Sequence, residues 1–285
     1  MSKSMKKQQW DLIIKPKTGW FDIDLQGIWR YRDLIAMFVR RDFVTLYKQT
    51  ILGPLWYIIQ PLFTTIVFTI IFNKVANIPT DKIPPFLFYL SGNVMWAYFA
   101  SCITRTSGTF TANAGIFGKV YFPRLTVPIA GVTINLLQFA IQFGLFLCFL
   151  LYFILKGAPI DLRLWIFALP VLLLQMALLG LGIGIIISSL TTKYRDLSFA
   201  LGMITQLWMY ATPIVYPLSL VPEWLKPWYL LNPMASIIES FRYAFLGSGT
   251  IAWSYIIMSW AMTLLFLIVG ILLFSRVEKT FMDTV

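Results

Sequence analysis

The chain has 285 residues, of which 59% are hydrophobic and only 12% are charged, and its mean hydropathy is +0.76. A soluble domain carries about a quarter charged residues, so this composition excludes an ordinary soluble protein and indicates that lipid surrounds most of the surface. The aromatic content of 17% excludes a disordered chain, and the two cysteines, Cys102 and Cys148, lie inside apolar runs, where we expect them to pack rather than to form disulfides.

The net charge of +11 does not indicate a nucleic-acid partner, because the basic residues fall mainly at the edges of apolar runs and in the first fifty residues. The sequence has no histidine, which removes the commonest general base and metal ligand. It also lacks a GxxxxGK[ST] loop and the C-x-x-C, H-E-x-x-H and G-x-S-x-G patterns. We therefore expect no catalytic residue, metal site or cofactor in this chain.

The first predicted element is an amphipathic helix from Gly27 to Thr50, in which apolar residues at helical spacing alternate with five basic residues. This pattern predicts a helix lying on the cytoplasmic membrane surface. A soluble helix packed on a partner is the alternative. Gly53 and Pro54 end the helix before the first membrane span.

Six charge-free intervals follow, and each exceeds the roughly 20 residues that a helix needs to cross a bilayer. They are Gln49–Asn73, Ile83–Thr104, Leu125–Leu155, Leu164–Thr192, Leu197–Pro222 and Tyr243–Ser275. An even number of spans puts both termini on one side of the membrane. Assigning that side to the cytoplasm places seventeen basic residues inside and six outside, as the positive-inside rule favours.

Three glycines in the fourth interval, Gly180, Gly182 and Gly184, superficially match a dinucleotide-binding fingerprint. They lie in mid-span with no preceding strand and no following acidic residue, so the match is spurious. Gly180 and Gly184 instead form a small-xxx-small pair, which predicts close packing of helices.

The stretch from Thr212 to Gly249 is apolar and aromatic but is interrupted by five prolines, too many for two crossings. Irregular backbone at membrane depth requires protein or water to satisfy its polar groups, so we predict a re-entrant pair of short helices on the outer side. A loop lying flat on the outer leaflet is the alternative. Glu239 and Arg242 are spaced to pair on one helix face.

All six intervals lack ionisable residues, whereas proton- and sodium-coupled pumps carry such groups inside the membrane. The energy for transport should therefore enter from outside the spans. The cytoplasmic segments Arg105–Arg124 and Lys193–Asp196 are too short for a motor domain but suit contact with one. A separate ATPase subunit is the hypothesis that follows.

Several motifs together resemble ABC-transporter permeases that export polysaccharides, in the order and at the intervals of that family. They are Arg41-Asp42, Tyr47-Lys48-Gln49-Thr50-Ile51-Leu52-Gly53-Pro54-Leu55-Trp56 with Pro61, Lys119-Val120-Tyr121-Phe122-Pro123-Arg124, Tyr194-Arg195-Asp196-Leu197, Thr212-Pro213-Ile214-Val215-Tyr216-Pro217 and Asn232-Pro233-Met234. The resemblance runs from about residue 25 to the end. It implies a transmembrane domain over residues 25–285, preceded by a cytoplasmic extension over residues 1–24.

The resemblance also implies partners. In that family two permease copies pair with two nucleotide-binding subunits, which carry the ATP and magnesium, and short coupling helices dock into the ATPases. The corresponding candidate residues are Asn113, Lys119, Tyr121, Tyr194, Arg195 and Asp196. Gly115 and Gly118 each cost a helix about 1 kcal/mol, so we expect the first coupling helix to be short or ordered only on its partner.

The family's substrates are lipid-linked glycans, namely O-antigen, capsule or wall teichoic acid. Sugar rings stack on aromatic faces, so the resemblance implies an aromatic-lined channel. The channel candidates are Trp56, Phe63, Tyr89, Trp96, Tyr98, Phe99, Trp208, Tyr210 and Tyr216, and the candidates for an outer gate are Trp224, Trp228 and Tyr229. Aromatic residues also gather at membrane interfaces as lipid anchors, which is the alternative for each of them.

The sequence thus predicts an all-helical, multi-pass permease of the bacterial plasma membrane, acting as a homodimer in polysaccharide export. An ABC exporter of a drug or a lipid is the alternative within this class. A membrane-embedded acyl- or glycosyltransferase is more distant, because the absence of histidine and the scarcity of acidic clusters leave it without an evident base or metal site.

Overall fold

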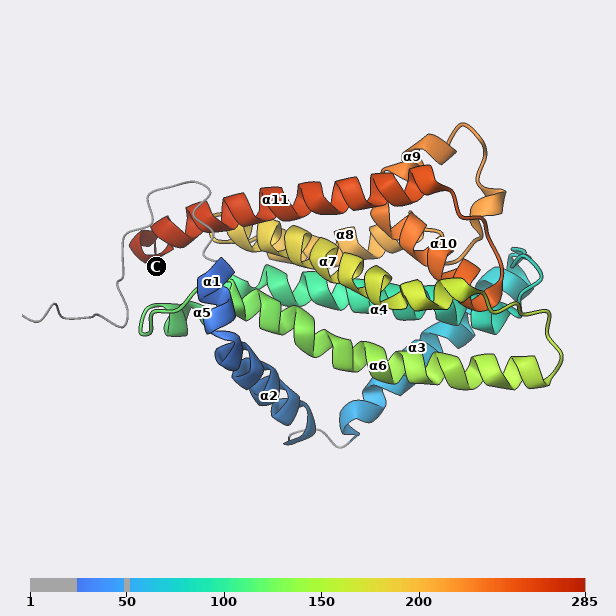
Figure 1. Cartoon of the computed structure of the whole chain (residues 1–285), viewed down its shortest axis with the longest axis horizontal. Coiled ribbons are helices and arrows are strands. Elements are labelled where there is room, and N and C mark those ends of the chain that lie inside the picture. The colour runs from blue at the N-terminus through green and yellow to red at the C-terminus, as the bar shows by residue number, and fades with distance from the viewer. Residues whose placement is uncertain (1–24, 49–51, 285) are drawn as a thin grey trace, which may run out of the picture.

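The computed structural model describes residues 25–48 and 52–284, and within them the chain is helical with no strand (Figure 1). The predicted N-terminal extension lies outside this part. The elements are α1 (Leu25–Arg30), α2 (Arg32–Lys48), η1 (Gly53–Leu55), α3 (Trp56–Phe68), η2 (Thr69–Val75), α4 (Pro85–Ser107), α5 (Thr109–Phe117), α6 (Thr126–Leu155), η3 (Leu164–Ala168), α7 (Leu169–Thr191), α8 (Leu197–Tyr210), η4 (Leu218–Leu220), α9 (Lys226–Leu230), α10 (Pro233–Leu246) and α11 (Trp253–Thr284).

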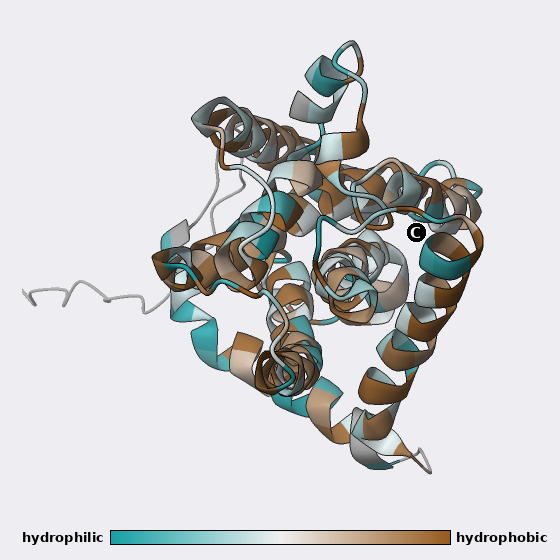
Figure 2. Cartoon of the chain, turned by 90° about the vertical axis from the view of Figure 1, so that its right-hand side faces the viewer, coloured by the Kyte–Doolittle hydropathy of each residue, from teal (hydrophilic) through white to brown (hydrophobic). Residues whose placement is uncertain are grey.

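Five helical segments of the described chain are long and apolar enough to cross a bilayer. They are Gly53–Val75, Pro85–Ser107, Thr126–Leu155, Leu164–Thr191 and Trp253–Glu278. In Figure 1, α4, α6, α7 and α11 run roughly along the long axis, and α3 runs obliquely to it. Figure 2, a view from the end opposite the C-terminus, shows hydrophobic residues on the outward as well as the inward sides of these helices. The first four match predicted intervals to within a few residues.

The predicted span Leu197–Pro222 does not form one continuous helix. α8 ends at Tyr210 after 14 residues, which is about 21 Å of helix against a hydrocarbon core of about 30 Å. The helix stops because Pro213 has no amide hydrogen and its ring collides with the preceding turn. A sixth span of full length is therefore not present in the described chain.

The predicted span Tyr243–Ser275 begins too early. Its first four residues belong to α10, which ends at Gly247 with a φ of 71°. A Cβ at Gly247 would lie 2.6 Å from the Cβ of Asp161, so only glycine fits this left-handed turn without displacing its neighbour. The last spanning helix starts instead at Trp253.

The stretch predicted to hold two short outer helices does contain α9 and α10, which lie toward the end of the bundle away from α5 in Figure 1. α9 is on the outside, whereas α10 is buried against α4, α7 and α11. The amphipathic segment is two helices, α1 and α2, which meet at Tyr31. Leu34 and Phe38 of α2 pack on a small cluster that includes Phe122, whose ring centroid is 6.0 Å from that of Phe38. α2 is therefore attached to the bundle along one of its faces.

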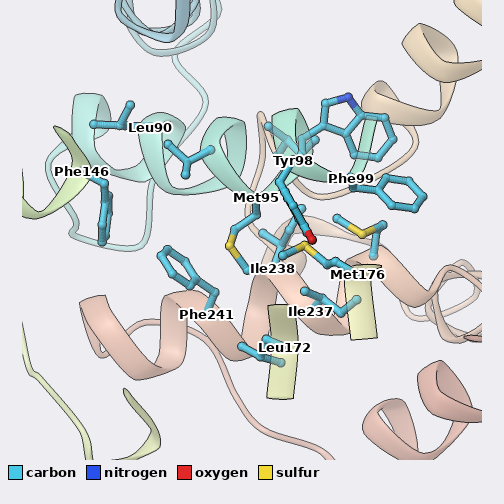
Figure 3. Packing of buried hydrophobic residues seen from close by; sticks show 14 of the residues in the cluster. Leu90, Met95, Tyr98, Phe99, Phe146, Leu172, Met176, Ile237, Ile238 and Phe241 are labelled. Carbon is cyan, nitrogen blue, oxygen red and sulfur yellow. The ribbon is translucent and has the colours of Figure 1, made fainter. Parts of the chain in front are cut away.

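The core is built around α4, which contacts α6, α7, α10 and α3. Figure 3 shows its side chains interlocking with those of the helices around it. The labelled residues are Leu90, Met95, Tyr98, Phe99, Phe146, Leu172, Met176, Ile237, Ile238 and Phe241.

The glycines of α7 allow this close packing, as predicted. A Cβ at Gly180 would lie 2.6 Å from the Cβ of Cys102, and one at Gly182 would lie 2.7 Å from the backbone nitrogen of Leu267. α7 therefore approaches α4 on one side and α11 on the other. Cys102 is buried as expected, whereas Cys148 is exposed, because it lies on a face of α6 that no other helix covers.

Candidate functional site

One end of the bundle gathers α5, the turn between α7 and α8, and the last turns of α11 (Figure 1). Two long-range hydrogen bonds hold these parts together. The Phe110 amide donates to Ser188 Oγ over 3.2 Å, and Arg124 donates to the Glu278 carbonyl over 2.6 Å. We refer to this end as the α5 end.

α5 is a two-sided helix. Its inner side is anchored by Phe110, whose ring stacks on Phe274 with centroids 4.5 Å apart, and by buried Phe117. Its outer side is open, and Ile116 there is 37% exposed although it is apolar. The helix has nine residues and ends before Gly118, so the prediction of a short helix is confirmed, but it is ordered within this single protomer.

The structure brings five of the six candidate coupling residues to the surface at this end. Lys119, Arg195 and Asp196 are exposed, and Tyr121 and Tyr194 are 57% and 50% exposed. The exception is Asn113, which is half-buried and donates to the Thr109 carbonyl over 2.9 Å, within α5 itself. Tyrosine and arginine are enriched at protein interfaces, so a surface that exposes Tyr121, Tyr194 and Arg195 suits docking of another protein.

A buried arginine organises the opposite half of the molecule. Arg242 on α10 is 1% exposed, and it donates to the carbonyls of Pro213 over 2.6 Å and Ile214 over 2.8 Å. Its guanidinium lies 3.6 Å from the ring centroid of Phe88 on α4. Its ion pair with Glu239, at 3.6 Å, confirms the predicted pairing.

Sequence analysis found that pair but missed what Arg242 does beyond it. Pro213 and Pro217 interrupt the helix and leave nearby carbonyls without helical donors, and a guanidinium supplies five N–H groups. The sequence signal for this role was an arginine within an apolar stretch, about thirty residues after Pro213. Asn232 adds to the same bracing, because it caps α10 through Met234 N and accepts from Trp208 Nε1 over 3.2 Å.

The aromatic residues predicted to line a channel divide into three groups. Tyr89, Tyr98 and Phe99 are fully buried and Trp96 is 5% exposed, so all four lie in the core of one protomer. Trp208 and Tyr216 are half-buried. Trp56, Phe63 and Tyr210 are 53%, 65% and 43% exposed. The three residues that are fully buried cannot contact a substrate in this conformation, because other side chains already cover them.

The three gate candidates all belong to the α9 region. Trp224 and Trp228 are 72% and 67% exposed. Tyr229 is half-buried, and its hydroxyl lies 2.5 Å from that of Tyr216. This contact joins the α9 region to the segment that Arg242 holds.

A cleft of about 290 Å³ between α3, α4 and α6 is lined by uncharged polar side chains. They are Gln60, Thr64, Asn93, Ser101, Gln138 and Gln142, beside the wall formed by Trp96. Gln142 is 2% exposed and its Oε1 accepts no hydrogen bond within the described part of the chain. An amide oxygen buried without a donor costs about 1–3 kcal/mol, so it is a position at which a ligand hydroxyl or water would bind favourably.

The sequence contained a signal for this cleft that a search for charged groups overlooks. Gln60 and Thr64 are four residues apart, and so are Gln138 and Gln142. That spacing puts each pair on one helix face. Uncharged polar side chains at helical spacing inside membrane spans are therefore a further signal of a polar lining.

Comparison with known proteins identifies the class. Residues 33–246 match the model of the ABC-2 type transporter family, and the chain belongs to this family. An O-antigen export system permease protein from Klebsiella pneumoniae is 30% identical over 252 residues, which are 88% of this chain and 94% of that protein.

Other relatives have lower sequence identity but match over a similar share of both chains. A capsule polysaccharide export inner-membrane protein from Neisseria meningitidis is 23% identical over 90% of this chain and 95% of its own length. A polysialic acid transport protein from Escherichia coli is 24% identical over 87% of this chain and 95% of its own length. The resemblance inferred from the motifs is therefore confirmed at the level of the family.

Proposed function

We propose that this chain is the permease subunit of an ATP-driven exporter that moves a lipid-linked polysaccharide, of the O-antigen, capsule or teichoic acid kind, across the bacterial plasma membrane. The names of the relatives support the class of substrate. The observation that carries the proposal is the uncharged polar cleft between α3, α4 and α6, because it offers hydrogen bonds to hydroxyl groups without any charge.

The chemistry of the cleft suits a sliding glycan. Sugars present hydroxyls at the ring edges and apolar patches on the ring faces, so amides can satisfy the edges while aromatic side chains contact the faces. A charged wall would hold one segment and resist the next. Within the proposal, a second copy of the chain completes the channel, and exposed Trp56, Phe63 and Tyr210 are the aromatic residues available to the polymer.

The driving force is proposed to come from two nucleotide-binding subunits that carry ATP and Mg²⁺ and dock on the α5 end. Exposed Tyr121, Tyr194 and Asp196 support this assignment, because they form a surface that no other part of the described chain covers. The α5 end and both termini would face the cytoplasm, as the excess of basic residues in the adjoining segments favours. Within the proposal the short helix α8 and the segment after it make the return crossing, since α8 starts at the α5 end and α11 starts at the other end (Figure 1).

The α9 and α10 region is proposed to form a re-entrant gate on the outer side, with Trp224, Trp228 and Tyr229 at its rim. Its bracing supports this role. Arg242 donates to the segment before the gate and lies over Phe88 of α4, and α4 is followed directly by α5. Movement of α5 by a docked ATPase would therefore reach the gate through one rigid helix.

The proposal is tested with Gln142→Leu, which removes the unpartnered amide but keeps a similar volume. Because its Oε1 has no donor to lose, the protein should fold at least as well as the wild type. Export should fall about fivefold, the worth of roughly 1 kcal/mol of lost hydrogen bonding. The measurements are surface polysaccharide in a strain that carries only the variant gene, and the melting temperature of the purified permease.

Gln175→Leu is the matched control, because Gln175 is also a buried amide but lies outside the cleft and donates to Ser259 Oγ over 2.7 Å. It should lower stability and leave export per folded molecule unchanged. Wild-type export by Gln142→Leu would remove the cleft from the pathway. Unchanged surface polysaccharide in a strain lacking the gene would overturn the function itself.

A further inference from the structure

α2 and α6 enclose a second groove, separate from the polar cleft, with a volume of about 560 Å³. In Figure 1, α2 runs away from the bundle at an angle beside α6. The α2 side of the groove is one helical stripe, formed by Arg32, Ile35, Ala36, Val39, Arg40 and Phe43, and the α6 side is formed by Thr133, Ile134 and Leu137. Apart from the two arginines and one threonine, every lining residue is apolar.

The two arginines give the groove a net positive charge. Arg32 and Arg40 are eight residues apart, which separates their backbones by about 12 Å along the helix. Arg32 has one carboxylate at the limit of ion pairing, that of Asp33 at 4.0 Å. For Arg40, no carboxylate of the described chain lies within ion-pair distance. No acidic residue lines the groove.

The acidic residue Asp42 of α2 forms ion pairs with arginines outside the groove. Asp42 accepts from Arg41 over 2.9 Å and also from Arg105 on α4. Asp42 is therefore engaged with two other arginines and is not available to neutralise Arg40. The positive charge of the groove remains for an external anion.

The position of the groove determines which anion can reach it. α6 is long and apolar enough to cross the membrane, and beside the groove Leu136 of α6 and Met37 of α2 are exposed, so the groove opens toward lipid. An amphipathic helix with basic residues that joins such a helix lies at the depth of lipid headgroups. A molecule entering the groove from that side has an apolar chain and a headgroup, and guanidinium groups bind phosphate in a bidentate manner.

We propose that the groove between α2 and α6 is a binding site for an anionic membrane phospholipid. The phosphate of the lipid lies between Arg32 and Arg40, and an acyl chain packs along Ile35, Val39 and Leu137. The bound lipid would fasten α2, which leads into the first span, against α6. Basic pockets beside membrane helices on the cytoplasmic side commonly hold anionic lipid headgroups in this way.

This site is distinct from the proposed glycan pathway. Thr133 lines the groove and Gln142 lines the polar cleft. At about 100° per residue, the groove residues Thr133, Ile134 and Leu137 and the cleft residues Gln138 and Gln142 point in mean directions about 110° apart, so the two sites lie on adjacent faces of α6. Lipid binding and glycan export can therefore fail independently.

The test is binding of dioleoyl phosphatidylglycerol to the purified full-length permease in detergent, measured by native mass spectrometry, with dioleoyl phosphatidylcholine as the neutral comparison. Phosphatidylglycerol should bind more tightly. Arg32→Gln and Arg40→Gln should each weaken its binding about fivefold, since a basic residue near an anionic headgroup is worth a factor of this size. Arg30→Gln changes the same charge on neighbouring α1, outside the groove, and should leave binding unchanged.

A second pair of variants tests the acyl-chain contact without altering charge. Thr133→Trp and Ala36→Phe both fill the groove, and both positions are exposed, so the fold tolerates them. Each should abolish preferential binding of phosphatidylglycerol while the melting temperature without added lipid stays the same. Retained binding in both variants would overturn the groove as the site.

Other outcomes also count against the proposal. An equal loss in Arg30→Gln would mean diffuse attraction to the whole helix, and equal binding of both lipids would exclude an anion site. Displacement of phosphatidylglycerol by inorganic phosphate would assign the arginines to a soluble anion. Its displacement by purified lipid-linked glycan at equal concentration would assign the groove to the transport substrate.

Discussion

The first spanning segment, Gly53–Val75, and its neighbour α4 have the same length of 23 residues but opposite places in the molecule. In the most apolar stretch of each segment, 78% of the residues of α4 are buried, against 17% in the first segment. We therefore call α4 the centre of the protomer and the first segment its rim. The more central helix is also the more polar one, with buried Ser91, Asn93 and Thr106 along it. Hydropathy therefore locates spans, but buried polar and small residues indicate which span other helices surround.

The contrast explains why similar aromatic residues have different roles. Tyr98 on α4 packs against Phe139 with centroids 5.6 Å apart and is fully buried. Phe63 on the rim is 65% exposed and meets lipid or a partner. Substitutions on the two sides should therefore differ in what they damage, which is stability in the centre and assembly or transport at the rim.

The largest effect is expected for Arg242→Ala, which removes the side chain that links α10 to the carbonyls of Pro213 and Ile214 and to α4. It leaves Glu239 buried without its ion pair and also creates a cavity, at a cost of about 5 kcal/mol. We expect almost no folded protein in detergent by size-exclusion chromatography. Arg242→Lys should rescue only partly, because lysine keeps the charge but loses the planar fork. A normal yield of Arg242→Ala would show that the centre does not depend on this link.

The next effect compares Tyr98→Ala with Phe63→Ala. Truncation of a fully buried aromatic side chain costs about 3 kcal/mol through the cavity that remains, so Tyr98→Ala should lower the melting temperature by several degrees. Phe63→Ala should leave the melting temperature of the protomer unchanged and lower export per folded molecule. Equal destabilisation by the two variants would contradict the division between centre and rim.

A smaller loss is expected for Gly184→Ala on α7. The added Cβ would lie 1.6 Å from Thr106 Oγ1, so α7 and α4 must separate slightly, at a cost of about 2 kcal/mol. Gly144→Ala on α6 is the control, because its Cβ meets no atom within 4 Å. Thermal unfolding in one detergent measures both. A melting temperature of Gly184→Ala equal to that of Gly144→Ala would mean that the close approach of α4 and α7 is not needed.

The sequence predicted what depends on local chemistry. Four of the spanning segments, the shortness of α5, the pairing of Glu239 with Arg242 and the packing role of Gly180 follow from hydropathy, glycine and spacing within a helix. The family was also evident, because its motifs are short and contiguous.

Two failures come from local helix breakers that hydropathy does not register, because Pro213 divides one apolar interval and Gly247 ends a helix inside another. The other failures depend on tertiary contacts. Tyr98 is buried and Phe63 is exposed because of the helices that surround α4. The hydropathy of the sequence does not show which helices those are. The polar cleft needed three helices to bring Asn93, Gln60 and Gln142 together.

The smallest change in protomer stability is expected at Gly202 on α8. Substitutions there also test what covers the exposed face of this helix. This helix exposes a row of apolar residues, Phe199, Met203, Ile204, Leu207 and Tyr210, which either lipid or a second copy of the chain must cover. A Cβ at Gly202 meets no atom of the described chain within 4 Å, so Gly202→Ala should change stability by less than about 1 kcal/mol.

A larger side chain at the same place separates the two possible covers. Lipid adapts its shape to Gly202→Leu at little cost, whereas a second protein copy packed closely on α8 cannot, because small residues at a helix contact allow backbones to approach. We expect the proposed homodimer to dissociate in Gly202→Leu while each protomer keeps its melting temperature. Gly144→Leu, on the open face of α6, should remain a dimer. Light scattering of both variants in detergent measures this directly, and a Gly202→Leu protein that stays dimeric would place lipid, rather than a partner, against α8.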